Sequence, residues 1–513
     1  MLAYIMRRLG ILLVILFGSS FILFNLAAIS GDPLADLRIS KDPNAKQQMA
    51  VLIRDLHLNV PPPIRYFLWL KGILGGLVGN LDFGKARDGQ LVSTSIASAI
   101  PVTLRLISMA TFTAIILGIT IGIVTALRQY SRFDYAMTFV SFLLFSLPIF
   151  WVAVLLKEFM AIQFNNFLRE PTVAPPWLIG LSLFSGIFWS AVIGGTRKRV
   201  WIVFGFAASI SAALLTFLSL SKWFLNPGFG PITLLLIYIG VAFGVTQLSV
   251  GLNSRAALKS SLTMAALGIV FYFPVQKIFM AENKLLFFPL LVLVTIGLAV
   301  GVSFIFAKID RGPTIRTTVI SAAIMGLLMI IDKLMHTWKP YMENDAINAR
   351  PVPTIGQTNA LLEPGNYWLS TLDIVMHLIL PTIALTAISF AGYIRYSRGT
   401  LLEVLNQDYI RTARAKGLTE RTVIMRHAFR NTLIPLTTII VVDIAGIVGG
   451  AIITERVFGW RGMGTLFNDA INRFDLNLLM GVFFLTASLA VLANLVADLL
   501  YSALDPRIRV NTQ

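Results

Sequence analysis

Residues 407–418 have the sequence QDYIRTARAKGL, and this polar segment lies between strongly apolar regions of the chain. Leu401, Leu405, Tyr409 and Ala413 recur every four residues, which predicts one apolar face of a helix. Gly417 suits the left-handed residue that ends many helices. Thr419 can then cap a second helix, whose positive end favours the neighbouring Glu420. The sequence therefore predicts a helix–Gly–helix unit.

Two uses of this unit fit the pattern equally well. A helical knob that projects from a membrane domain is a docking surface for a soluble partner. An amphipathic loop that lies on the bilayer surface has the same spacing of apolar residues. The residues alone do not choose between these interpretations.

The composition on either side of the unit is that of a membrane protein. The chain has 513 residues, of which 56% are hydrophobic and only 13% are charged. Soluble domains have about 25% charged residues, so a soluble fold of this length lacks the polar residues to cover its surface. Because lipid accepts apolar surface, we expect an all-α, polytopic membrane protein with the lipid bilayer as its main partner.

A membrane span needs about 20 apolar residues, because the hydrocarbon core is about 30 Å thick and a helix rises 1.5 Å per residue. Twelve segments meet this criterion. They lie near residues 9–29, 103–127, 135–160, 176–194, 200–220, 231–250, 261–280, 285–307, 317–335, 373–394, 434–454 and 480–502.

The basic residues alternate between loops as the positive-inside rule requires. Arg7 and Arg8 precede the first span, and basic clusters follow every second span thereafter. This pattern predicts twelve spans with both termini in the cytoplasm, and the first span as an uncleaved helix. The net charge of +17 is spread over these short loops and forms no basic module, so we expect no nucleic-acid partner.

The sequence offers little for chemistry of its own. There is no cysteine, and the four histidines are far apart in sequence, so a bound metal is not expected. Residues 79–85 have the Gly-x-x-x-x-Gly-Lys spacing of a P-loop, but Ala86 stands where Ser or Thr is required. We therefore expect no catalytic residues, no cofactor and no nucleotide site in this chain.

Several motifs resemble one family of membrane proteins. The segment 407–418, followed by RHAFRN at 426–431 and LIP at 433–435, resembles the "EAA" loop of the permease subunits of binding-protein-dependent ABC importers. Arg411, Thr412, Ala413 and Gly417 occupy the Glu-Ala-Ala-x-x-x-Gly frame. The similarity is greatest to the first permease of the dipeptide/oligopeptide/nickel branch. Further motifs of that branch occur in chain order at 6–33, 79–84, 100–104, 377–382, 454–464 and 498–507.

The resemblance implies a type I importer permease in the bacterial cytoplasmic (inner) membrane, which imports peptides or related small solutes by alternating access. It implies a homologous second permease, two ABC ATPase subunits that use ATP and Mg²⁺, and an extracytoplasmic substrate-binding protein. The ATPase-coupling loop would be residues 395–433. Its implied functional residues, with neighbours, are Tyr409, Arg411, Thr412, Ala413, Arg414, Ala415, Lys416, Gly417, His427, Asn431 and Pro435.

The family usually has six spans, and residues 165–365 resemble nothing in it. We therefore expect a permease core at 1–164 and 366–513, split by an inserted bundle of six spans at 165–365. The insertion is either an accessory bundle or an addition without a role in transport. Asp443 lies within the eleventh span, where it either lines the translocation path or pairs with another helix. The alternative function is a self-sufficient twelve-span secondary transporter, which would require matched halves.

Overall fold

The structure is a computed structural model of the full chain. It describes residues 2–279, 284–308, 311–363, 365–447 and 450–504. Within these ranges the chain is helical throughout, apart from turns, loops and one isolated bridge between Lys85 and Leu91. The expected all-α fold is confirmed.

The helices fall into three consecutive groups. The first group comprises α1 (Leu2–Ser30), α2 (Ala35–Ile39), α3 (Ala45–Asp55), α4 (Pro62–Leu74), α5 (Val92–Leu127), α6 (Arg132–Ser146), α7 (Ile149–Leu156) and α8 (Gln163–Phe167). The second group comprises α9 (Pro175–Ile193), α10 (Arg197–Leu220), α11 (Gly230–Ser249), α12 (Arg255–Val270), α13 (Tyr272–Ile278), α14 (Lys284–Phe306) and α15 (Arg311–Met342). The third group comprises α16 (Tyr367–Leu405), α17 (Asp408–Ala415), α18 (Glu420–Thr422), α19 (Phe429–Gly446), α20 (Ile452–Phe458), α21 (Met463–Asn472) and α22 (Leu476–Leu504).

Short 3₁₀ and π segments interrupt or extend these helices. The 3₁₀ segments are Gly75–Val78 and Trp223–Leu225. The π segments are Lys157–Ile162, between α7 and α8, and Val423–Ala428, between α18 and α19.

Nine helices in the described ranges are long and apolar enough to cross a membrane, or eleven if each of two bent pairs is one span. The predicted span at 434–454 corresponds to α19, which is not among them. The predicted span at 135–160 is not one straight helix, because α6 and the helix that follows it meet at 103°. Leu147 is extended at this bend because it precedes Pro148. The multi-pass architecture is confirmed, with a count close to the predicted twelve.

The centre of the molecule is the crossing of α5 and α16. At this crossing Gly118 faces Tyr393, and Gly122 faces Ser397. A Cβ atom built on Gly122 would lie 1.9 Å from the Ser397 hydroxyl oxygen, so only glycine fits there. The Ser397 hydroxyl also donates to the Gly118 carbonyl oxygen at 3.3 Å. Small residues thus let two long helices approach closely, as is common in membrane proteins.

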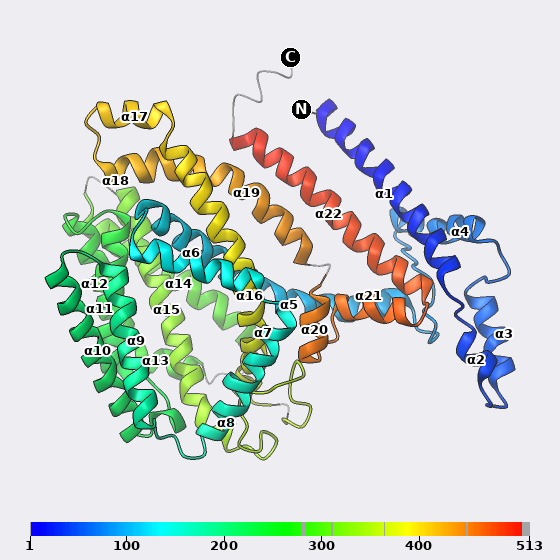
Figure 1. Cartoon of the computed structure of the whole chain (residues 1–513), viewed down its shortest axis with the longest axis horizontal. Helices are drawn as coiled ribbons and strands as arrows, with labels where there is room; N and C mark the ends of the chain where they lie inside the picture. The colour runs from blue at the N-terminus through cyan, green and yellow to red at the C-terminus, as the bar shows by residue number, and fades with distance from the viewer. Residues whose placement is uncertain (1, 280–283, 309–310, 364, 448–449, 505–513) are drawn as a thin grey trace.

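Helices α9 to α15 form a bundle to one side of this crossing (Figure 1). Residues of α11, α12, α14 and α15 share an apolar core with Trp368 of α16. The bundle is tied to α16 by a buried hydrogen bond of 2.9 Å, which the Tyr341 hydroxyl donates to Asp373. Asn165 also exchanges two hydrogen bonds with the backbone of Val352. The loop that follows α15 therefore joins the bundle to the rest of the chain by specific contacts.

The predicted basic loops gather at one end of the molecule. Helices α17 and α18 lie at this end, as do the start of α1 and the end of α22 (Figure 1). Arg128, in the turn after α5, donates to the carbonyl oxygen of Val192 at the end of α9. Thr317 near the start of α15 donates to Ser249 at the end of α11, at 2.7 Å. The arrangement agrees with the alternation of charged loops along the sequence.

Candidate coupling site

Helix α17 rests on the ends of α5 and α16. Ile410 is fully buried and Ala413 nearly so, in a cluster with Leu401 of α16 and Ala126 of α5. Val423 and Ala428 complete this cluster from the chain that follows α17. The inner face of the unit is therefore fixed against the two helices that cross at the centre of the molecule.

The four apolar residues that predicted one helix face, from Leu401 to Ala413, lie on two helices. Helix α16 ends at Leu405, and α17 begins at Asp408. The side chain that enters the core from the first turn of α17 is Ile410, whereas Tyr409 is 43% exposed. The four-residue spacing found the buried face correctly at Leu401 and Ala413, but it missed the break between the helices.

Gly417 ends α17 in the predicted left-handed conformation, with φ of +76°. Its N–H donates to the carbonyl oxygen of Arg414, and the N–H of Leu418 donates to that of Ala413. These two bonds are the Schellman pattern, which satisfies carbonyl groups at a helix end. A Cβ atom on Gly417 would meet nothing within 4 Å, so glycine is required by the backbone and not by crowding.

The second half of the unit begins as expected. Thr419 accepts a hydrogen bond from the N–H of Thr422 at 3.4 Å and so caps α18. Glu420 pairs with Arg414 through two contacts, of 2.7 and 3.2 Å, which brace α17 against α18. The Arg414 guanidinium lowers the pKa of the Glu420 carboxyl from its ordinary value. Both groups are exposed, so the pair orients the two helices more than it stabilises the fold.

The structure brings some of the predicted residues together and separates others. Asn431 at the start of α19 donates to the Tyr409 hydroxyl at 2.9 Å, which joins the two ends of the unit. His427 is half-buried in the π segment, and Pro435 lies inside α19. The remaining predicted residues form the exposed outer face of the unit. They are Arg411, Thr412, Arg414, Ala415, Lys416 and Gly417.

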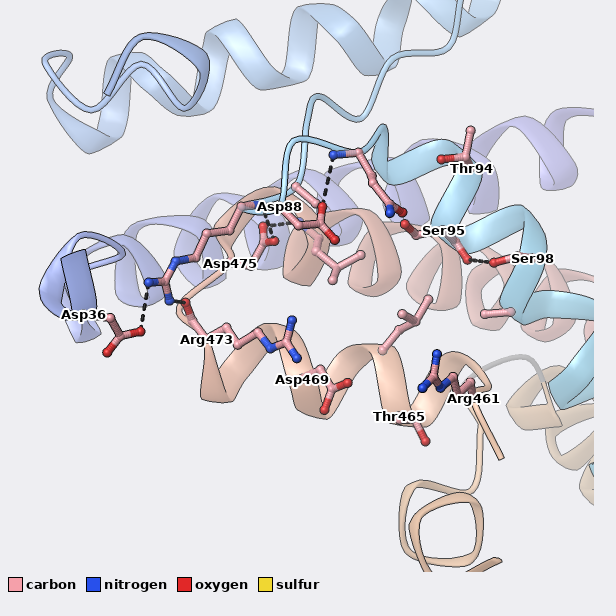
Figure 2. Close-up of a pocket in the computed structure, with 16 residues that line it drawn as sticks. Asp36, Asp88, Thr94, Ser95, Ser98, Arg461, Thr465, Asp469, Arg473 and Asp475 are labelled. Atoms are coloured by element: carbon pink, nitrogen blue, oxygen red, sulfur yellow. Dashed lines mark hydrogen bonds and ion pairs between the residues drawn. The ribbon is translucent and has the colours of Figure 1, made fainter. Parts of the chain in front are cut away.

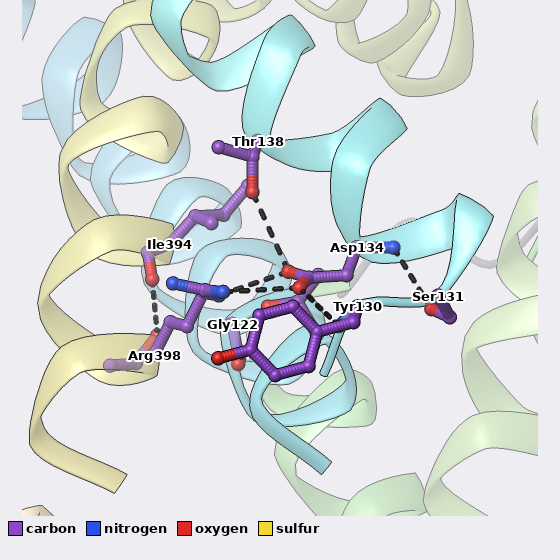
Figure 3. Close-up of polar contacts among 9 residues, drawn as sticks. Gly122, Tyr130, Ser131, Asp134, Thr138, Ile394 and Arg398 are labelled. Atoms are coloured by element: carbon purple, nitrogen blue, oxygen red, sulfur yellow. Dashed lines mark hydrogen bonds and ion pairs between the residues drawn. The ribbon is translucent and has the colours of Figure 1, made fainter. Parts of the chain in front are cut away.

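Sequence reasoning missed the ion pair that anchors α16 immediately before the unit. Arg398 donates to both carboxylate oxygens of Asp134, at 2.9 and 3.0 Å (Figure 3). Asp134 is buried and also accepts from the N–H of Tyr130 at 3.1 Å. The pair therefore joins the first turn of α6 to α16. Arg398 lies within the predicted coupling loop 395–433, and no local signal links it to a residue 264 positions away.

A second missed residue organises the junction of α5, α20 and α21. Glu455 of α20 is fully buried. It accepts from the Thr103 hydroxyl of α5 at 2.9 Å and from the N–H of Thr465 in α21 at 2.8 Å. Thr103 in turn accepts from the N–H of Met463 at 2.7 Å. The segment 454–464, which was noted only for its resemblance, is thus the junction of three helices.

Asp443 has features of a residue that pairs with another helix and of one that lines the translocation path. Its carboxylate accepts a hydrogen bond of 2.5 Å from the Tyr393 hydroxyl of α16, so it is paired with another helix. It also lies on an exposed face of α19 within the single chain. The hydrogen bond to Tyr393 compensates part of the cost of placing a carboxylate in an apolar environment.

Comparison with known proteins identifies the family. Residues 266–510 match the family described as binding-protein-dependent transport system inner membrane component. The oligopeptide transport system permease protein AppB of Bacillus subtilis is 36% identical over 246 residues, which are 46% of this chain and 72% of AppB. The chain belongs to this family.

Two other relatives match over shorter lengths. The oligopeptide transport system permease protein OppB of Mycobacterium tuberculosis is 37% identical over 188 residues, which are 37% of this chain and 55% of OppB. The dipeptide transport system permease protein DppB of Escherichia coli K12 is 46% identical over 147 residues, which are 29% of this chain and 42% of DppB. The chain thus spans about half the length of OppB and of DppB.

Proposed function

We propose that the chain is a transmembrane permease subunit of an ATP-driven, binding-protein-dependent importer of peptides in a bacterial cytoplasmic membrane. The observation that carries this proposal is the α17–α18 unit, whose inner face is buried on α5 and α16 while its outer face is exposed. A surface loop on lipid needs no such attachment. The names of the relatives, which are oligopeptide and dipeptide permeases, support the choice of substrate.

In this proposal the outer face of α17 binds a separate ABC ATPase subunit. A homologous second permease completes the pore and binds a second ATPase subunit, and a substrate-binding protein delivers peptide to the far side. ATP-driven closure of the two ATPases moves α17, and the buried contacts of Ile410 and Ala413 pass that movement to α5 and α16. The pore then alternates between its two openings.

Co-expression tests this assignment. We expect the purified chain alone to hydrolyse no ATP, and the assembled complex to hydrolyse ATP and to take up a labelled dipeptide or tripeptide. Sustained hydrolysis by the chain alone, or peptide uptake without the ATPase subunits, would favour a self-sufficient transporter and overturn the proposal.

Asp443 is proposed to line the translocation path. Asp443→Asn removes the charge but keeps an oxygen that can accept from Tyr393, whereas Tyr393→Phe keeps the charge and removes the hydrogen bond. We expect uptake to change in the first variant and to stay near normal in the second, at equal amounts of assembled complex. The reverse result would assign Asp443 to helix pairing.

The division of the chain at residues 165 and 365 is also part of the proposal. Helices α9 to α15 are proposed as an accessory bundle inserted into a permease core. Helices α11, α12, α14 and α15 pack around one apolar core, which supports this division, although Trp368 of α16 also enters that core. The family match begins at residue 266, inside the proposed insertion, so the boundary needs a test of its own. Replacing 165–365 by a short linker should leave assembly intact if the core is independent.

A further inference from the structure

A polar cavity lies between α21 and the start of α5 (Figure 2). In Figure 1 these two elements lie on the side of the molecule away from α17. Its volume is about 980 Å³. Cavities that bind small molecules have volumes of about 300–1,000 Å³. The cavity is therefore large enough for a ligand of several residues, and the proposed coupling mechanism does not use it.

One wall of the cavity is a row of side chains along α21. Arg461, Thr465, Asp469 and Arg473 are spaced four residues apart, so they follow one side of the helix and of the residues that flank it. Figure 2 shows them in this order along the ribbon. The charges along the wall are therefore positive, negative and positive.

The three charged side chains of this row have no ion pair or side-chain hydrogen bond to any residue that the structure describes. Their neighbours at the end of the cavity are engaged. Arg87 pairs with Asp36 at 2.9 Å, and the N–H of Arg87 donates to the buried carboxylate of Asp475 at 2.6 Å. The charges of α21 are thus held beside a fixed polar scaffold and are free to bind a ligand.

The opposite wall is small and hydroxylated. It is formed by the first turns of α5, where Thr94, Ser95, Ser98 and Ala99 line the cavity. These side chains leave room between α5 and α21. The Ser98 hydroxyl donates to the carbonyl oxygen of Ser95 at 2.8 Å, so its oxygen remains as an acceptor. The Ser95 hydroxyl can donate or accept, and together the two suit a peptide backbone.

We propose that this cavity binds a short peptide with a free amino and a free carboxyl terminus, before the peptide enters the pore. Asp469 would hold the ammonium group, and Arg473 or Arg461 would bind the carboxylate in the two-bond geometry that guanidinium groups favour. Asp469 and Arg473 are about 6 Å apart along the helix axis. An extended peptide spans about 3.3 Å per residue, so peptides of two to four residues match the row. This inference rests on the proposed function and names its substrate site.

The shape of the site favours a small ligand over a docked protein. Stable protein–protein interfaces bury about 1,200–2,000 Å² and are formed by exposed surfaces of comparable extent. Here the unpaired charges line a cavity between two helices, and Asp469 is half-buried within it. The experiment must therefore distinguish binding of a peptide in the cavity from docking of the substrate-binding protein over it.

Because the chain has no cysteine, a single introduced thiol reports on the cavity. We would place Ser98→Cys in the full chain in lipid nanodiscs and measure its rate of alkylation with and without trialanine. Trialanine should slow alkylation, whereas N-acetyl-trialanine amide, which lacks both charges, should not. Thr172→Cys, at an exposed position in the loop before α9, is the matched control and should be unaffected by either peptide.

Two variants in the Ser98→Cys background then test the charged row. One carries Asp469→Asn, and the other carries both Arg461→Gln and Arg473→Gln. Loss of a charge-assisted contact should raise the trialanine concentration for half-protection about tenfold. Equal protection by the blocked peptide, or unchanged protection in these variants, would overturn the inference. Protection by peptide-free binding protein but not by trialanine would also overturn it and would assign the cavity to docking.

Uptake by the assembled complex separates this inference from the proposed function. Normal peptide uptake by the wild-type complex without protection of the thiol would remove the cavity site and leave the importer assignment standing. Absence of any peptide uptake by the complex would remove both.

Discussion

At the scale of single residues, Gly417 has a left-handed backbone and open space around it. Substitutions at this position therefore differ in backbone strain and not in crowding. A β-branched residue in this conformation costs about 1–2 kcal/mol, whereas Asn adopts it readily. We expect Gly417→Val to reduce ATP-driven peptide uptake strongly and Gly417→Asn to retain most of it. Uptake is measured in cells that express the whole transporter, with the amount of complex in the membrane determined in parallel.

If Gly417→Asn impairs uptake as severely as Gly417→Val, the effect comes from contact with a partner and not from the reversal between α17 and α18. Both variant proteins should insert and fold, because position 417 is exposed and a Cβ atom built there meets no atom of the chain within 4 Å.

The ion pair of Arg398 and Asp134 gives a second prediction at this scale. Removing Arg398 leaves a buried carboxylate without its cation, which is more costly than the pair is favourable. We expect Arg398→Ala to lower the free energy of unfolding by about 2 kcal/mol, because two charge-assisted hydrogen bonds are lost. Thermal unfolding of the purified chain in detergent measures this.

The control for this prediction is the double variant Asp134→Ala, Arg398→Ala. Removing both charges avoids the unpaired carboxylate, so the double variant should be less destabilised than the sum of the two single variants by about 1 kcal/mol. Strict additivity would show that the two side chains contribute independently, contrary to the geometry of Figure 3.

At the scale of elements, the crossing of α5 and α16 depends on a close approach at one position. In Gly122→Ala the new methyl would overlap the Ser397 hydroxyl oxygen and lie 2.9 Å from the carbonyl oxygen of Ile394. The helices must separate, and we expect a loss of about 1–3 kcal/mol in the free energy of unfolding. The same thermal unfolding measurement detects the loss.

Two further variants make this prediction specific. Gly392→Ala places the same methyl on α16 where nothing lies within 4 Å, so it should be neutral or slightly stabilising. Adding Ser397→Ala to Gly122→Ala removes the closest contact and should restore part of the stability. A Gly122→Ala protein as stable as Gly392→Ala would mean that the two helices are not held at this distance.

The elements that could be predicted from the sequence are those with local signals. Gly417 and Thr419 mark their helix ends through backbone conformation and a hydrogen bond three residues away, so both were predicted correctly. The bond between Asn431 and Tyr409 spans 22 residues and that between Arg398 and Asp134 spans 264, and neither leaves a trace in periodicity. The bend at Pro148 had a local signal, but the apolar run on both sides of it concealed the break.

At the scale of the whole molecule, the distribution of apolar surface is that of a chain in lipid. Helix α10 has no buried residue within the described chain, although it is 24 residues long and strongly apolar. A helix that is hydrophobic on all sides needs an apolar environment around it. Helix α9 covers one side of α10, so lipid or another subunit must cover the rest.

The segments before α9 and before α10 report which side of the membrane each end of the molecule faces. Thr196 precedes Arg197, Lys198 and Arg199, and such clusters are retained in the cytoplasm. Thr172 lies before α9, whose 19 residues span about 28 Å. Both threonines are exposed, and the chain has no cysteine of its own. An impermeant thiol reagent added to spheroplasts should therefore label Thr172→Cys, whereas Thr196→Cys should react only after the membrane is opened. Since α17 lies at the same end as the basic turns, labelling of Thr196→Cys from outside would also place α17 outside, beyond the reach of any ATPase, and the coupling assignment would fail with it.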